Sequence, residues 1–191
     1  MLTQITDNIT KCTLGDQGNV YFLDLKDRNK KIIIDTGNRT FREELKNFLG
    51  RQVNFNEVDI VIFTHLHYDH CGNADLFPNA KFYASAEELE DLALDPNGTV
   101  LDKVVVDKLP PLSALPQTIE GLKVIKTPGH TRGSICLYLE SQKVLFTGDT
   151  LFADRKQGRV DLPTSDPDSM KLSLMKIIEF HVKHLCPGHD Y

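Results

Sequence analysis

The sequence predicts a single domain built from both strands and helices. Its 191 residues fall within the usual size of one domain, and 40% of them are hydrophobic, which is enough for one substantial core. Strand-like and helix-like segments alternate along the chain, and no low-complexity linker divides it. We therefore expect residues 1–191 to fold as one unit.

The composition disfavours several classes of function. The 22 basic and 27 acidic side chains give a net charge of −5 without long basic blocks, so neither a nucleic acid nor a membrane is expected as a partner. The longest apolar runs are far shorter than the ~20 residues of a membrane helix. The first residues lack the pattern of a signal peptide, and the four cysteines form no C-x-x-C pair. These features predict a cytoplasmic protein with reduced thiols, and they leave a homo-oligomer open.

The first half of the chain is predicted to contain short strands and two helices. The strands are runs rich in β-branched or aromatic residues, at 9–14, 20–25, 31–34, 58–63 and 81–84. Thr40 is a candidate cap for a helix whose apolar residues recur at helical spacing as far as Gly50. Ser85 and Glu88 have the spacing of a capping box, which predicts a second helix to Leu94.

The second half is predicted to hold a proline-rich loop, further strands and one long helix. The loop is placed at residues 109–116 because this stretch contains three prolines. Strands are predicted at 122–126, 135–139, 144–146 and 185–187. Residues 153–165 are polar and irregular, and residues 166–180 are predicted as a helix. The apolar stripe of that helix is predicted to be Met170, Leu174, Met175 and Ile178.

The strongest functional signal is the run His65-x-His67-x-Asp69-His70, directly after the strand at 58–63. Imidazole and carboxylate side chains suit zinc, iron or manganese. Four such ligands within six residues cannot easily all face one ion, so two adjacent ions fit the pattern better. The alternative is a polar loop without any ligand role.

Three further candidate ligands lie in tight turns marked by proline or glycine. His130 and His189 each follow Pro-Gly, and Asp149 follows Gly148 at the end of a predicted strand, where its carboxylate could bridge two cations. His181 and His184 are predicted to be solvated or packing residues. Because the candidate ligands come just after strands, we expect them to share one rim of the fold.

Taken together, these segments resemble the metallo-β-lactamase superfamily over the length of the chain. Counterparts of its five motifs are Asp35, the cluster at 65–70, His130, Asp149 and His189. The resemblance implies an α+β fold, an αββα four-layer sandwich of two mixed sheets flanked by helices. It implies that His65, His67 and His130 bind one metal ion and that Asp69, His70 and His189 bind a second, with Asp149 bridging them. Asp35 would steady the histidine-rich loop, with a simple turn cap as the alternative.

The expected chemistry is hydrolysis by a metal-bridging hydroxide. A water shared by two divalent ions ionises near neutral pH, and Asp69 is placed to orient it. Zinc is expected, with iron or manganese as alternatives. Residues 158–163 resemble the small glyoxalase II-like (hydroxyacylglutathione hydrolase-like) hydrolases, which cleave thioesters such as S-lactoylglutathione. We therefore predict a metal-dependent hydrolase of a small-molecule thioester or ester.

Arg159 and Cys71 each have two possible roles. Arg159 is a candidate contact for an anionic substrate group, or else an ion-pair partner of Asp161 in the loop. Only two residues follow His189, whereas full-length glyoxalase II continues into a helical domain that contacts glutathione, so glutathione specificity stays open. Cys71 is expected to be a packed side chain, with redox sensitivity beside the metals as the alternative.

The main alternative function is persulfide oxidation. Persulfide dioxygenases of the same superfamily also resemble this chain at residues 158–161 and in the histidine-rich motif. The resemblance would place their single iron on His65, His130 and Asp149. A nuclease, a β-lactamase and a binding module without catalysis are disfavoured.

Overall fold

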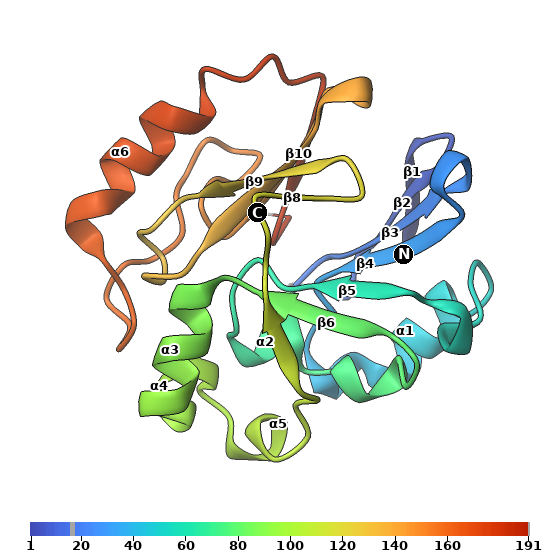
Figure 1. Ribbon diagram of the computed structural model, residues 1–191, viewed down its shortest axis with the longest axis horizontal. Helices are drawn as coiled ribbons and strands as arrows, with labels where there is room; N and C mark the ends of the chain where they lie inside the picture. The colour runs from blue at the N-terminus through green and yellow to red at the C-terminus, as the bar shows by residue number, and fades with distance from the viewer. Residues whose placement is uncertain (16–17, 191) are drawn as a thin grey trace.

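The computed structural model describes residues 1–15 and 18–190, and in this part of the chain two β-sheets pack face to face with helices on both outer sides (Figure 1). One sheet has seven strands: β1 (Leu2–Thr6), β2 (Ile9–Cys12), β3 (Val20–Leu25), β4 (Lys30–Ile34), β5 (Ile60–Ile62), β6 (Lys81–Ala84) and β7 (Leu112–Ala114). The other has five, in the order β12 (His184–Pro187), β11 (Val144–Gly148), β10 (Ile135–Leu139), β9 (Leu122–Lys126) and β8 (Thr118–Ile119).

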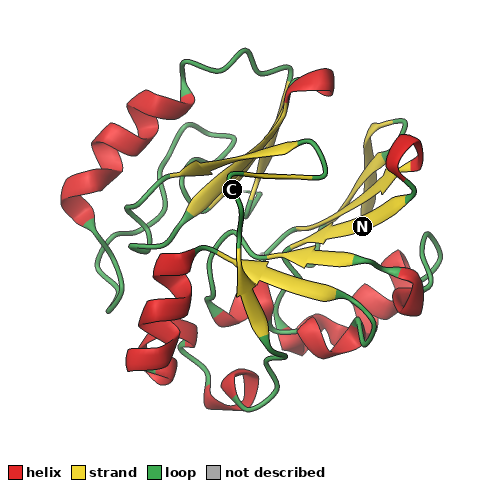
Figure 2. Ribbon diagram, viewed as in Figure 1, coloured by secondary structure: helices red, strands yellow, loops and turns green. Residues whose placement is uncertain are grey.

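The helices form the two outer layers. Five of them cover the seven-stranded sheet: α1 (Arg42–Leu49), α2 (Tyr68–Cys71), α3 (Ala86–Leu94), α4 (Pro96–Val100) and α5 (Lys103–Val106). The fourth layer is α6 (Pro167–Ile177), which lies outside the five-stranded sheet (Figure 2). Both sheets are mixed, because β1–β4 and β8–β11 pair antiparallel whereas β4–β7 and β11–β12 pair parallel. This α+β sandwich confirms the predicted fold.

The core follows from the alternation of side chains along the strands. In β4, Ile32 and Ile34 point between the sheets, whereas Ile33 packs on the helix side, and all three are fully buried. Tyr21 and Phe146 meet edge to face across the two sheets, with ring centroids 5.2 Å apart. Each such side chain stabilises the fold by about 1.5–3 kcal/mol through burial. The sheets are therefore a rigid support for the loops at their ends.

Two helix predictions need correction. Thr40 does not cap α1, because the chain first makes a 3₁₀ turn in which the side chain of Asn38 accepts the backbone N–H of Thr40 (2.8 Å). In α6 the predicted stripe is partly wrong, since Met175 and Ile178 are 53% and 74% exposed. The buried face of α6 instead contains Met170, Ser173 and Ile177. The polar Ser173 faces the sheet because its hydroxyl donates to the carbonyl of Pro128 (2.7 Å).

The segment predicted as a loop at 109–116 contains β7. Its prolines, at 110, 111 and 116, flank the strand rather than interrupt it, and β7 lies at the edge of its sheet, paired only with β6. The Ser85 cap of α3 is confirmed, because its hydroxyl accepts the N–H of Glu88 (3.1 Å).

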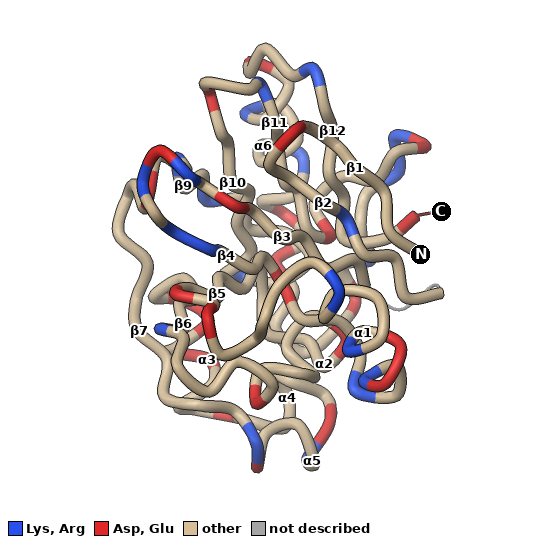
Figure 3. The backbone as a smooth tube through the Cα atoms, turned by 90° about the vertical axis from the view of Figure 1, so that its right-hand side faces the viewer, with Lys and Arg blue, Asp and Glu red and all other residues tan. Residues whose placement is uncertain are grey.

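Charged side chains of both signs are interleaved around the backbone (Figure 3). Several form ion pairs between elements, such as Arg39 with Asp75 and Lys30 with Asp59, each at 2.9 Å. Partly exposed pairs of this kind contribute about 0–1 kcal/mol each. Among the described residues, none of the helices has both the length and the apolar character needed to span a lipid bilayer.

Candidate metal centre

The polar residues singled out in the sequence meet where strands end. They follow β4, β5, β9, β11 and β12, and are Asp35, the cluster at 65–70, His130, Asp149 and His189. The rigid strands bring residues far apart in sequence to the same edge of the sandwich, as expected. His181 and His184 do not join this group: His181 is exposed, and His184 is half-buried at the start of β12.

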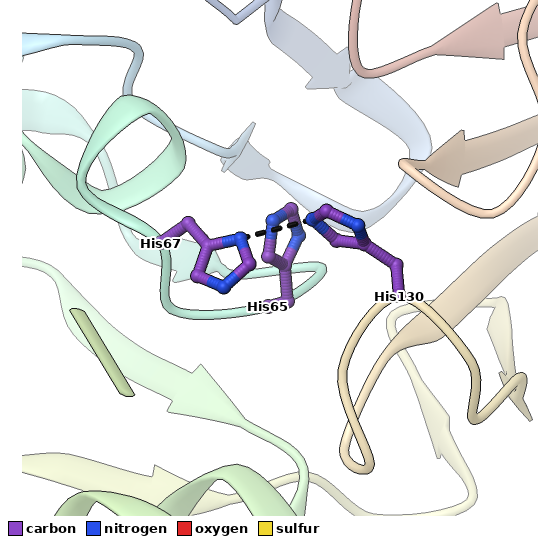
Figure 4. Close-up of side chains that lie close together, drawn as sticks. All are labelled: His65, His67 and His130. Carbon is purple, nitrogen blue, oxygen red and sulfur yellow. Dashed lines mark hydrogen bonds between the residues drawn. The ribbon is translucent and has the colours of Figure 1, made fainter. Parts of the chain in front are cut away.

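One group of donors, here called the first cluster, consists of His65, His67 and His130, whose rings point toward one another from two loops (Figure 4). All three offer a ring nitrogen within 4.8 Å of the others, and Nε2 of His130 lies 2.9 Å from Nδ1 of His67. On His65, Nδ1 is 3.2 Å from the Thr64 hydroxyl, and the buried Nε2 has no hydrogen-bond partner among the described residues. A buried nitrogen lone pair without a partner is costly unless a cation binds it.

The second cluster consists of Asp69, His70 and His189, whose donor atoms also lie within 4.8 Å of one another. Nε2 of His189 is 3.3 Å from Oδ2 of Asp69. Asp149 lies between the clusters, with Oδ1 3.3 Å from Nε2 of His70 and Oδ2 3.5 Å from Nε2 of His130. Its carboxylate is therefore in reach of ions at both positions.

Burial and charge divide the histidines into two kinds. Burial, with the neighbouring His130, lowers the pKa of His67 to about 3. Burial acts in the same direction on His70 and His189, but at His70 the charges of Asp149, Asp35 and Asp69 together outweigh burial and raise the pKa well above its usual value. Hydrogen bonds to Asp149 and Asp69 raise the pKa of His189 to about 9. The first cluster thus offers a neutral imidazole, and the second cluster holds positive charge beside its carboxylates.

The residues fit two adjacent divalent ions. Three imidazoles form one donor set, and two imidazoles with a carboxylate form the other, as zinc, iron or manganese accept. Gly188 permits the close approach of these donors, because a Cβ there would lie 2.1 Å from Oδ1 of Asp149 and 2.8 Å from Cε1 of His70.

Hydrogen bonds outside the clusters orient the ligands. The Asp35 carboxylate accepts from Nδ1 of His70 (2.9 Å) and from the backbone N–H and the hydroxyl of Thr64 (2.8 and 2.7 Å). It thus holds both ends of the histidine-rich loop, beyond what a turn cap would do. The backbone carbonyl of Arg159 accepts from Nδ1 of His130 (2.7 Å), which leaves Nε2 facing the cluster.

From the sequence, Glu88 is predicted only as part of a capping box. In the structure its buried carboxylate accepts hydrogen bonds from the backbone of Leu66 and the hydroxyl of Thr131, next to ligands of the first cluster. An acidic residue on a helix that must pack against a sheet was the available signal, but its partners lie far away in sequence. Cys71 is buried, with its thiol donating to the carbonyl of Leu66 (3.2 Å), as expected for a packed side chain.

A cavity of about 470 Å³ opens beside the clusters. Its lining comprises His67, Tyr68, Asp69, Leu101, His130, Asp149, Phe152, Arg159, Leu162 and His189. Arg159 contributes to the rim, and its guanidinium also donates two hydrogen bonds to Asp161 (2.7 and 2.9 Å). The pair with Asp161 is therefore present and exposed, whereas a contact of Arg159 with substrate stays a prediction.

A two-sheet sandwich with histidines and aspartates collected at one edge defines a metal-binding protein of the αββα class. Residues 13–189 match the Metallo-beta-lactamase superfamily. The chain therefore belongs to this superfamily.

The proteins similar to this chain include hydrolases. A probable metallo-hydrolase of Methanocaldococcus jannaschii is 35% identical, with 84% of this chain and 82% of that protein aligned. A hydroxyacylglutathione hydrolase of Francisella philomiragia is 30% identical over 87% of this chain and 61% of its own length. Among solved structures, the B3 metallo-beta-lactamase BLEG-1 superposes with a TM-score of 0.77 at 28% identity, covering 96% of this chain and 92% of that one. A protein solved in a di-iron-bound form has a TM-score of 0.74 at 26% identity, covering 95% and 92%.

Proposed function

We propose that the protein hydrolyses a small-molecule thioester or ester in the manner of glyoxalase II, using two divalent metal ions. The observation that carries the proposal is Asp149, whose two oxygens reach both clusters beside an open cavity. Similarity to hydroxyacylglutathione hydrolases supports the reaction class. We further propose zinc as the metal and the cytoplasm as the location, where the buried free cysteines would stay reduced.

His65, His67 and His130 would hold one ion, and Asp69, His70 and His189 the other, with Asp149 shared. Bound there, the ions supply Lewis acidity, which polarises a carbonyl oxygen and lowers the pKa of water to about 7. The same kinds of donor also suit iron, and one solved relative has a di-iron-bound form.

Asp69 is the residue proposed to orient the attacking water and accept its proton. It lines the cavity, and its Oδ2 lies 3.3 Å from Nε2 of His189. Burial raises the pKa of Asp69, but the charge of His70 and a hydrogen bond from His189 outweigh it, so the net pKa lies below its usual value. The carboxylate is therefore ionised near neutral pH and available as a hydrogen-bond acceptor.

The walls of the cavity are suited to a small acyl group. Tyr68, Leu101, Phe152 and Leu162 supply apolar surface around the polar clusters. Such surface binds acyl chains by removing them from water, and the metal-ligand residues lie directly beside it. Arg159 at the rim is the proposed contact for an anionic part of the substrate.

Metal analysis combined with substrate assays tests the proposal. We expect two metal ions per chain and release of free thiol from S-lactoylglutathione or from a neutral S-acyl N-acetylcysteamine. The sequence-based alternative, persulfide oxidation, predicts one iron per chain and persulfide-dependent O₂ uptake. That result without thioester or ester turnover would replace the hydrolase proposal.

A further inference from the structure

Glu88 in α3 is a buried carboxylate that binds two separate loops. Glu88 is only 1% exposed. Oε2 accepts the backbone N–H of Leu66 (2.8 Å), and Oε1 accepts the hydroxyl of Thr131 (2.5 Å). The two oxygens of one rigid group therefore link segments 65 residues apart.

Both partners of Glu88 are direct neighbours of metal-ligand residues. Leu66 lies between His65 and His67, and Thr131 follows His130. The first cluster is assembled from these two segments, which come from different sheets of the sandwich. The carboxylate thus connects the two halves of the cluster by hydrogen bonds to the neighbours of its ligands.

Contacts between the start of α3 and the turn that follows His130 hold Glu88 in place. The Ser85 hydroxyl donates to the carbonyl of Gly133 (2.7 Å). A Cβ on Gly133 would lie 2.6 Å from both Cγ and the backbone nitrogen of Glu88, so only glycine allows this contact. The Thr131 hydroxyl is also 2.8 Å from the Ser134 hydroxyl, which completes the network.

A buried acid at this position has an energetic cost that packing alone does not explain. Burial is the main cause that raises the pKa of Glu88 to about 7, against which the hydrogen bonds from Thr131 and Leu66 act. The nearby Arg132 pairs with Asp91 (2.8 Å) and Glu90 (3.0 Å) on the exposed side of α3. An apolar side chain would fill the space without this penalty.

We propose that Glu88 is a positioning residue for the first cluster, and that its carboxylate sets the distance between the His65–His67 loop and the His130 turn. The inference rests on the proposed metal centre and holds for any substrate. Groups that orient metal ligands typically change metal affinity or activity by about 10- to 100-fold when removed.

The main test replaces Glu88 by an unbranched apolar residue of similar length. In Glu88→Met, neither Leu66 nor Thr131 keeps an acceptor on residue 88. We expect Zn²⁺ affinity, measured by competition with a chromogenic chelator, to fall about 10- to 100-fold. The visible absorption spectrum of the Co²⁺-loaded protein should also change, because it reports ligand geometry. A purely structural role would lower the melting temperature and leave both readouts as in the wild type.

Two further variants sharpen the test. In Glu88→Gln, the amide oxygen can accept from Leu66 while the amide nitrogen donates to the Thr131 hydroxyl, so we expect affinity and spectrum to be largely restored. The control is Glu87→Met, an identical change at the adjacent residue, whose carboxylate pairs with Lys126 on the surface. We expect wild-type Zn²⁺ affinity and Co²⁺ spectrum for this control.

Thr131→Val keeps the inference testable if Glu88→Met does not fold. It removes the link on the His130 side and should weaken Zn²⁺ binding in the same direction. Wild-type affinity and an unchanged Co²⁺ spectrum in a folded Glu88→Met, or in Thr131→Val when the first variant is unfolded, would overturn the inference. None of these measurements uses a substrate, so a failure of thioester hydrolysis would count against the proposed function alone.

Discussion

Oδ2 of Asp35 lies 2.9 Å from Nδ1 of His70, and both residues are almost completely buried. This contact joins the end of β4 to α2 and leaves Nε2 of His70 facing Asp149, 3.3 Å away. A carboxylate that binds one ring nitrogen fixes the orientation of the ring and the availability of the other nitrogen. The geometry of the second cluster therefore depends on a residue that does not belong to it.

Replacing Asp35 should weaken metal binding. Asp35 has a left-handed backbone (φ 56°), which asparagine tolerates better than alanine. We expect Asp35→Ala to lower metal affinity or activity about 10- to 100-fold, and Asp35→Asn to lose less. The measurement is metal stoichiometry after dialysis, together with thioester turnover. Full metal content in a folded Asp35→Ala would show that the contact with His70 does not control the cluster.

Removing the shared carboxylate should have the largest effect on metal content. Asp149→Ala deletes the group that lies between the two clusters, so two closely spaced cations would repel each other without compensation. We expect loss of at least one ion per chain and of nearly all activity. Asp154→Ala is the matched control, since Asp154 pairs with Lys156 (2.7 Å) in the same loop and lies outside the clusters. Two bound ions and full turnover in Asp149→Ala would refute the bridging assignment.

The candidate ligands could be singled out in the sequence because local chemistry marks them, and their role as ligands stays a prediction. Runs of β-branched residues such as Ile32–Ile34 identify buried strands. The Pro-Gly turns before His130 and His189 mark positions just after a strand ends. Each of these signals lies within a few residues of the position that it marks. The family resemblance then supplied the layered arrangement that the structure confirms.

What the sequence did not predict depends on contacts between distant segments. Glu88 has the spacing of a capping residue, and nothing near it in sequence indicates partners 22 and 43 residues away. Helical spacing alone predicts a partly wrong buried face for α6, because it allows several stripes, and the hydrogen bond of Ser173 decides among them. The prolines predict a loop where β7 lies, because the pairing of this short edge strand with β6 leaves no signal in the nearby sequence.

Glu88 should make the metal-free protein less stable as the pH rises. Its folded pKa of about 7 lies above the usual value of 4.5, so the folded state keeps a proton that the unfolded state releases between these values. The stabilisation of the folded state by this bound proton is therefore fully present below pH 4.5, and it is lost as the pH rises through 7. Relative to Glu88→Gln, the wild type should lose about 2–3 kcal/mol of unfolding free energy between pH 5 and 8. Urea denaturation at both pH values, with chelator present, measures this difference; equal pH dependence in the two proteins would contradict it.

Gly188→Ala should impair the metal centre more than the fold. The added methyl group would lie 2.1 Å from Oδ1 of Asp149, so the carboxylate must move. We expect metal content and turnover to fall sharply while the protein stays folded by circular dichroism. Gly121→Ala serves as the control, because alanine is strained at the left-handed φ of 84° and the three atoms nearest to its added Cβ all belong to the flexible Arg28 side chain. Normal metal content in Gly188→Ala would show that the cluster tolerates displacement of Asp149.

Arg159→Ala separates the two roles of the arginine at the cavity rim. If the guanidinium leaves Asp161 to bind an anionic substrate group, its loss should raise KM for S-lactoylglutathione about threefold, the size expected for an exposed ion pair. KM for the neutral S-acyl N-acetylcysteamine and kcat for both substrates should stay unchanged, because Arg159 contributes only its backbone carbonyl to the metal centre. Lys156→Ala is the control, a cation in the same loop that does not line the cavity. An equal change in KM for both thioesters would mean that Arg159 shapes the loop through Asp161 and does not select the substrate.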